Sequence, residues 1–93
     1  MELTNKQVSY NCSNENETLK LTGAVYLNAD NIITQFSGTF NTLEGVYCGD
    51  FYYNETAEGK ANRATNNIPV ELIDLAGDFI LETVAEIKKE IIK

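Results

Sequence analysis

The side chains that could carry out chemistry in this chain of 93 residues are two cysteines, five tyrosines and an excess of carboxylates, with no histidine. Without histidine, acid–base catalysis near neutral pH would depend on carboxyl, thiol, phenol or amine groups with shifted pKa values. No candidate nucleophile has a histidine partner, and no glycine-rich phosphate loop follows a strand-like segment. We therefore expect a protein that is not an enzyme and uses no cofactor.

The two cysteines, Cys12 and Cys48, stand 36 positions apart, which is not a zinc-ligand spacing, so we expect no metal site. A disulfide between them would suit an exported protein. The predicted strands that carry them are the first and fourth of a meander, separated by three spacings of ~4.8 Å, whereas a disulfide needs Cα atoms within ~7 Å. Cys12 is also predicted to face inward and Cys48 outward. Two reduced thiols are the expectation, as in a cytoplasmic protein.

Acidic residues outnumber basic ones by 14 to 7, giving a net charge of −7, so we expect no nucleic-acid partner. The charge itself is typical of a protein kept in solution by repulsion. No segment approaches the ~20 apolar residues of a membrane span, and residues 1–18 do not resemble an export signal. We expect a cytoplasmic location and no membrane association, with secretion only if a signal has been removed.

Apolar residues alternate along three segments, 19–27, 32–40 and 43–53, which predicts β-strands with one apolar face. Residues 3–12 and 59–65 are weaker candidates for a first and a last strand. Loops at 28–31 and 41–42 would pair Leu27 with Ile32 and Phe40 with Leu43. In that register Phe36 lies opposite Gly23 and Tyr47. The apolar side of the three segments comprises Leu19, Leu21, Gly23, Val25, Leu27, Ile32, Thr34, Phe36, Gly38, Phe40, Leu43, Gly45, Tyr47, Gly49, Phe51 and Tyr53.

A single amphipathic helix is predicted from Pro69 to Lys93, because proline suits a first helical turn and apolar residues then recur with helical spacing. Its apolar stripe comprises Leu72, Ile73, Ala76, Phe79, Ile80, Thr83, Val84, Ile87 and Ile91. The predicted fold is one α+β domain over 1–93. A four- to five-stranded antiparallel meander (1–67) carries one long C-terminal helix (68–93) packed across one face.

Four glycines of the central strands fall on the apolar side: Gly23, Gly38, Gly45 and Gly49. Glycine inside a strand usually marks a bend or a close backbone approach. One interpretation is therefore that the sheet coils there and the helix settles close to it. The other is a concave pocket between sheet and helix for a small apolar ligand.

The opposite sheet face is uncharged at its centre and carries tyrosines, which is typical either of the middle of an interaction surface or of a half-solvated sheet. Its candidate interaction residues are Tyr26, Ile33, Gln35, Val46, Cys48 and Tyr52. Further apolar residues on the helix flank, Val70, Leu75, Leu81 and Ile92, favour a homodimer.

The leading hypothesis from sequence is therefore a non-catalytic protein-interaction module that binds a protein partner or itself. A carrier of a small apolar ligand, using the pocket between sheet and helix, is the alternative. A third hypothesis is an acidic mimic of nucleic acid, based on the carboxylate stripe from Glu71 to Glu86.

Overall fold

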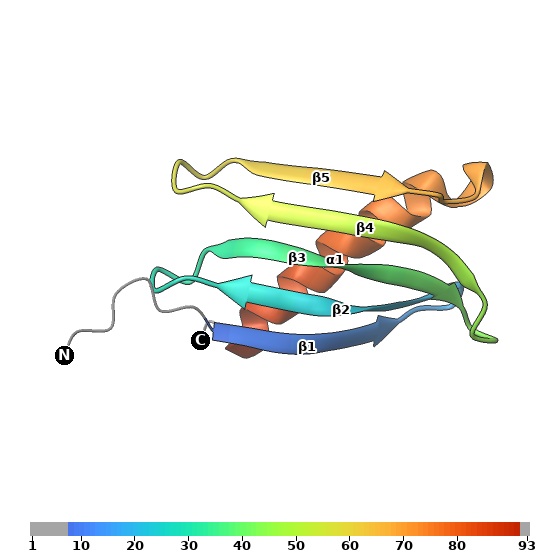
Figure 1. The fold of residues 1–93 in the computed structure, drawn as a ribbon, viewed down its shortest axis with the longest axis horizontal. Helices are drawn as coiled ribbons and strands as arrows, with labels where there is room; N and C mark the ends of the chain where they lie inside the picture. The colour runs from blue at the N-terminus through green and yellow to red at the C-terminus, as the bar shows by residue number, and fades with distance from the viewer. Residues whose placement is uncertain (1–7, 92–93) are drawn as a thin grey trace.

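A computed structural model, which describes residues 8–91, contains five antiparallel strands in one sheet and one helix against it (Figure 1). The strands follow one another in space in chain order, as a meander, and the α+β prediction is confirmed. The elements are β1 (Val8–Glu15), β2 (Leu19–Leu27), β3 (Ile33–Thr42), β4 (Tyr47–Glu55), β5 (Ala61–Asn66), a single 3-10 turn η1 (Val70–Leu72) and α1 (Ile73–Ile91). The predicted strand and helix ends at Leu3 and Lys93 lie outside the described residues.

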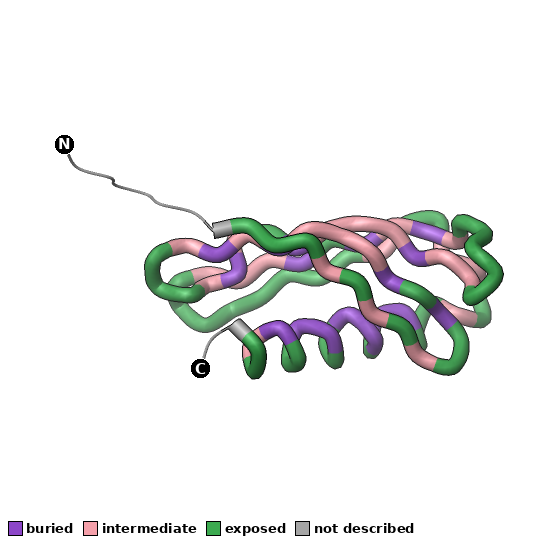
Figure 2. Tube along the Cα trace, turned by 90° about the horizontal axis from the view of Figure 1, so that it is seen from below, coloured by how far each residue is buried: buried purple, intermediate pink, exposed green. Residues whose placement is uncertain are grey.

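The core lies between the apolar face of the sheet and one side of α1, whose buried residues all turn toward the sheet (Figure 2). Phe51 stands at its centre, with its ring centroid 4.8 Å from that of Phe36 and 5.3 Å from that of Phe40. Phe40 in turn meets Phe79 of the helix at 6.4 Å. The buried apolar residues are Leu19, Leu21, Val25, Leu27, Ile33, Phe36, Phe40, Phe51, Tyr53, Ala76, Phe79, Ile80, Val84 and Ile87.

The register between β2 and β3 differs from the predicted one, because the loop between these strands is one residue longer than predicted. Leu27 pairs with Ile33 instead of Ile32, and Gly23 pairs with Gly38 instead of Phe36, with an irregularity between Tyr26 and Leu27. The cause is the Asn28 side chain, whose Oδ1 accepts hydrogen bonds from the N–H groups of Asp30 and Ile32 at 2.9 and 3.0 Å. This turn holds Ile32 in the loop, and β3 begins one residue later.

The hairpin between β3 and β4 also differs from its prediction, since β3 continues to Thr42 and the loop spans 43–46. Phe40 pairs with Gly49, not with Leu43. Leu43 and Tyr47 were predicted to face the core, but they are 48% and 52% exposed. Gly45, another predicted core-side glycine, occupies the loop with φ +91°.

A repeated four-residue pattern explains this loop. Thr42 donates its N–H to the Val46 carbonyl at 2.8 Å, accepts the Gly45 N–H on its own carbonyl at 2.9 Å, and accepts the Val46 N–H on its side-chain oxygen at 3.1 Å. The same three bonds recur from Thr56 to Lys60 between β4 and β5, where Gly59 has φ +84°. Both loops read Thr-x-Glu-Gly and need glycine at a positive φ, as three-residue hairpin loops do.

The α-helix begins later than predicted. Pro69 keeps an extended ψ of 139° and precedes one 3-10 turn, in which the Leu72 N–H bonds to the Pro69 carbonyl at 2.8 Å, and α1 starts at Ile73. Ile73 was predicted in the apolar stripe but is 45% exposed. Within residues 8–91, no helix is both long enough and apolar enough to cross a bilayer.

Candidate functional site

The predicted interaction face is only partly assembled by the sheet. Tyr26 pairs with Gln35, and Tyr52 pairs with Ser37, all on the face away from α1. Tyr52 is 41% exposed, and Gln35 is also open to solvent. These three of the six predicted residues share one surface, together with Ser37.

The other three predicted residues of that face lie elsewhere, and their assignment to it is wrong. Ile33 is completely buried in the core, because the irregularity beside Leu27 reverses the direction of its side chain. Cys48 occupies the extra position between Phe40 and Asn41 on the partner strand, and it packs against the core. Val46 belongs to the hairpin loop and is 62% exposed.

No ligand cavity is lined by the four predicted glycines, so that assignment is also wrong. Gly23 and Gly38 face each other on adjacent strands, and a Cβ atom on Gly38 would collide with the Thr22 carbonyl. The Phe51 ring covers Gly23, with Cζ 3.1 Å from where a Cβ would lie, and the Ile68 side chain fills the space over Gly49. The close-approach interpretation describes these glycines, and Gly45 serves a turn.

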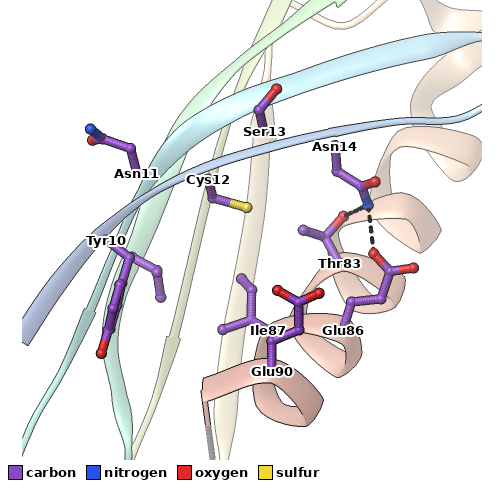
Figure 3. Close-up of a pocket in the computed structure, with 10 residues that line it drawn as sticks. Tyr10, Asn11, Cys12, Ser13, Asn14, Thr83, Glu86, Ile87 and Glu90 are labelled. Carbon is purple, nitrogen blue, oxygen red and sulfur yellow. Dashed lines mark hydrogen bonds between the residues drawn. The ribbon is translucent and has the colours of Figure 1, made fainter.

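A cleft of about 500 Å³ instead opens between β1 and the C-terminal half of α1 (Figure 3). The helix crosses the sheet obliquely, so its last turns lie under the β1 edge (Figure 1). Polar and apolar side chains share the lining: Tyr10, Asn11, Cys12, Ser13, Asn14, Val25, Thr83, Glu86, Ile87 and Glu90. No sequence signal located this cleft, because its position depends on the crossing direction of the helix.

One hydrogen-bonded cluster fixes β1 to α1 at one end of the cleft. Asn14 Nδ2 donates to Thr83 Oγ1 at 3.0 Å and to Glu86 Oε2 at 3.2 Å. Thr83 is 1% exposed, and its hydroxyl donates a hydrogen bond to the Phe79 carbonyl at 2.8 Å. Since a buried hydroxyl needs such partners, the cluster sets the spacing between strand and helix.

The cleft is acidic. Burial, and then the charges of Glu86 and Glu90, raise the pKa of the Cys12 thiol. The described lining residues include neither lysine nor arginine. Cys12 therefore stays protonated at neutral pH and is a poor nucleophile, so the cleft is suited to binding a cation more than to covalent chemistry.

The rim of this cleft is an open sheet edge, because among residues 8–91 β1 pairs with β2 and with no other strand. The Asn16 N–H bonds to the Leu19 carbonyl at 3.0 Å, which sets the alternation of hydrogen bonds along this strand pair. Even-numbered residues of β1 consequently bond to β2. The main-chain N–H and C=O groups directed to the open edge belong to Ser9, Asn11 and Ser13.

The opposite edge, β5, is shorter and carries a cation. Its Arg63 side chain lies on the helix side and donates from Nη1 to the Gly77 carbonyl at 3.1 Å. A short edge and an inward-facing charge both discourage strand pairing. β1 has eight residues and no proline, lysine or arginine. The two edges therefore differ in their capacity to accept another strand.

A second polar cluster joins β4 to α1 away from the cleft. Glu55 forms an ion pair with Lys88 and accepts hydrogen bonds from the Tyr53 hydroxyl at 2.7 Å and the Ile33 N–H at 3.1 Å. Burial alone would raise the pKa of Glu55, but these three donors outweigh burial and lower it. Burial and the bond to Glu55 raise the pKa of Tyr53. The Glu55 carboxylate and the Lys88 ammonium group are paired with each other, so this cluster is a structural link between β4 and α1.

Among residues 8–91, no group of three or more acidic or cysteine side chains is placed so that it could hold a metal ion. The chain matches no protein-family model, no curated protein and no solved structure. The cleft and the adjoining edge of β1 form the candidate functional site.

Proposed function

We propose that this chain is a non-catalytic binding module that accepts an extended segment of a protein partner along the β1 edge, over the cleft between β1 and α1. The observation that carries this proposal is that the open edge of β1 borders the cleft between β1 and α1. Strand addition draws its affinity from main-chain hydrogen bonds and its selectivity from pockets for alternate side chains. The open edge of β1 offers the main-chain hydrogen bonds, and the adjoining cleft offers the pockets.

The cleft provides the pockets for alternate side chains of the bound segment. Side chains of an added strand that stand opposite Tyr10, Cys12 and Asn14 would point toward α1, because directly opposed residues share a face of the sheet. Tyr10 and Ile87 offer them apolar contact, and Asn14 and Glu86 offer polar contact.

The outer sheet face supports a second docking surface less well. Tyr26, Gln35 and Tyr52 lie there, but the apolar Ile33 that would have anchored a contact is in the core. The helix flank supports a homodimer less well too. Leu75 and Leu81 are exposed, but six helical positions place them about 120° apart around the axis, on opposite borders of the buried stripe. Ile92 lies outside the described residues.

The proposal is tested by titrating the 15N-labelled protein with an acetylated and amidated eight-residue threonine–valine peptide, followed by NMR. Amide shifts should concentrate at Ser9, Asn11 and Ser13, whose N–H groups gain acceptors. Asn11→Pro removes one donor from the open edge and leaves the bonds between β1 and β2 in place. Asn11→Thr is the matched control, because it changes the side chain and keeps the N–H.

Loss of binding in Asn11→Pro and its retention in Asn11→Thr would support strand addition, provided that both variants keep the parent far-ultraviolet circular dichroism. Equal binding by both variants, or shifts centred on Tyr26 and Tyr52, would contradict it.

A further inference from the structure

We infer that the segment bound along β1 is cationic and presents lysine or arginine at alternate positions, so that the two cations meet Glu86 and Glu90. This inference depends on the proposed strand addition and adds the chemistry of the partner to it. Three features of the cleft support it: the spacing of the carboxylates, their orientation toward β1, and the apolar surface between strand and helix.

The spacing of the two carboxylates matches that of an extended chain. Glu86 and Glu90 are four positions apart on α1, one turn of helix, which separates them by about 6 Å along the axis. Side chains on one face of a strand repeat every about 6.7 Å, at residues i and i+2. Because α1 crosses the sheet obliquely (Figure 1), the separation along an added strand is shorter than this axial rise. The long side chains of two lysines or arginines on alternate residues can take up the difference and each reach one carboxylate.

Both carboxylates are directed at the strand edge. The Asn14 amide of β1 donates to the Glu86 carboxylate at 3.2 Å, and Glu90 lines the same cleft one helical turn farther along α1. Figure 3 shows Glu86 beside Asn14, and Glu90 next to Ile87, between Glu86 and the Tyr10 side of the cleft. An added strand along β1 would pass both in turn.

The surface between the carboxylates suits long basic side chains. Ile87 lines the cleft with apolar atoms, over which the methylene groups of a lysine or arginine can lie while the charge reaches the carboxylate. The Tyr10 ring stands at the rim, 42% exposed, and can face a cation.

A second copy of this chain fits the edge poorly. Antiparallel pairing of β1 with itself places a two-fold axis perpendicular to the sheet, so both helices lie on one face. Glu86 and Glu90 of the two copies would then meet across the axis as four like charges, which opposes pairing. A basic segment neutralises these charges, whereas a copy doubles them.

The test compares four eight-residue peptides that match β1 in length. The first is the neutral threonine–valine peptide. The second carries two lysines at positions i and i+2, the third carries them at i and i+3, and the fourth has glutamates in place of the lysines of the second. In an extended chain the i and i+3 side chains point to opposite faces, so the third peptide keeps the charge and loses the geometry.

We expect the i, i+2 peptide to bind more tightly than the neutral and i, i+3 peptides, and the glutamate peptide not to bind. The double variant Glu86→Gln/Glu90→Gln should weaken binding of the i, i+2 peptide by roughly three- to thirtyfold, the range for two partly exposed ion pairs. It should weaken the i, i+3 peptide less, because only one of its lysines faces the helix side, and should leave the neutral peptide unchanged. Glu82→Gln is the matched control, an exposed carboxylate on α1 outside the cleft. Raising the salt concentration should have the same effect as the double variant.

The outcomes separate this inference from the proposed function. Equal binding of the neutral and i, i+2 peptides, both lost in Asn11→Pro, would retain strand addition and overturn the cationic partner. Equal binding of the two lysine peptides would also overturn it, since alternation would carry no information. Binding of the i, i+2 peptide that is insensitive to Asn11→Pro would overturn strand addition itself. Mild oxidation could also trap a stable dimer through a disulfide between the Cys12 residues of two copies. That result would mean that the β1 edge pairs with a second copy of this chain, and it would overturn the cationic partner.

Discussion

The Ile68 side chain occupies the space that a Cβ atom on Gly49 would need. Gly49 stands opposite Phe40, next to the extra residue of β4, and its φ of +138° lies in a region that side chains rarely adopt. Two independent requirements therefore select glycine here: the backbone conformation and the room for Ile68. The segment between β5 and α1 is thereby anchored on the sheet.

Gly49→Ala should destabilise the protein by about 2–4 kcal/mol, because it adds overpacking to backbone strain. Gly45→Ala is the matched comparison, since Gly45 also has a positive φ but has no atom within 4 Å of a Cβ position, and it should cost about 1 kcal/mol. Ile68→Val, which removes Cδ1, should recover part of the loss when combined with Gly49→Ala. Urea unfolding measures the stability of Gly49→Ala, Gly45→Ala, Ile68→Val and the double variant Gly49→Ala/Ile68→Val. Equal costs for the two glycine variants would contradict the packing assignment.

The ion pair of Glu55 with Lys88 should make stability depend on acid pH. The pKa of Glu55 is lowered in the folded protein, so its contribution is complete above its ordinary pKa of 4.5 and is lost as pH falls through the lower, folded value. Glu55→Gln should cost about 1–2 kcal/mol at pH 7, below the value for a fully buried charged bond because the Lys88 side chain is 43% exposed.

The measurement is the unfolding free energy from pH 7 down to pH 3 for the parent and for Glu55→Gln, with Glu58→Gln in the exposed loop as control. The difference between parent and Glu55→Gln should shrink toward low pH. A constant difference would mean that the ionisation of Glu55 is not responsible.

The thiol of Cys12 should report the acidity of the cleft. Glu86→Gln/Glu90→Gln removes two of the causes that raise its pKa, so its alkylation by iodoacetamide at pH 7.5 should become a few-fold faster. Cys48 is the internal control, because burial is the cause that raises its pKa. Rates are read separately in Cys48→Ala and Cys12→Ala backgrounds; acceleration of both thiols would point to general loosening instead.

Neighbouring residues of β4 should respond oppositely to substitution. Tyr52 lies on the outer face, so Tyr52→Asp should change stability by less than about 1 kcal/mol, whereas Phe51→Ala should cost about 3–5 kcal/mol through loss of the aromatic core. Thermal unfolding with circular dichroism distinguishes the two. A large loss in Tyr52→Asp would contradict the assigned faces.

The buried face of an element could be predicted from sequence where its apolar residues follow one regular spacing. Along β2 each second residue is apolar from Leu19 to Leu27, and all are buried except Gly23, which is partly buried. In α1 the spacing of Ala76, Phe79, Ile80 and Thr83 likewise predicted the buried side. Periodicity fixes which side of an element is buried, and in both elements no insertion interrupts it.

The register was not accessible by the same reasoning, because turn chemistry decides it. Reading Asn41 and Thr42 as the loop shifted β4 by six positions relative to Phe40, and put Tyr47 in the core. The recurrence of Thr-x-Glu-Gly at 42–45 and 56–59 was a visible signal for both loops. The extra residue at Cys48 had no such signal, and the cleft had none either, because periodicity says nothing about the angle at which a helix crosses a sheet.

The order of elements along the chain has a consequence for biosynthesis. All five strands precede α1, so a growing polypeptide presents the apolar faces of β2, β3 and β4 before the segment that shields them leaves the ribosome. Until then Phe36, Phe40 and Phe51 have no second layer to pack against, and such nascent intermediates are prone to aggregate or to recruit chaperones. A nascent chain whose five strands have left the exit tunnel while α1 is still inside it would therefore expose the apolar face of the sheet. Emergence of the nineteen residues of α1 would then cover that face.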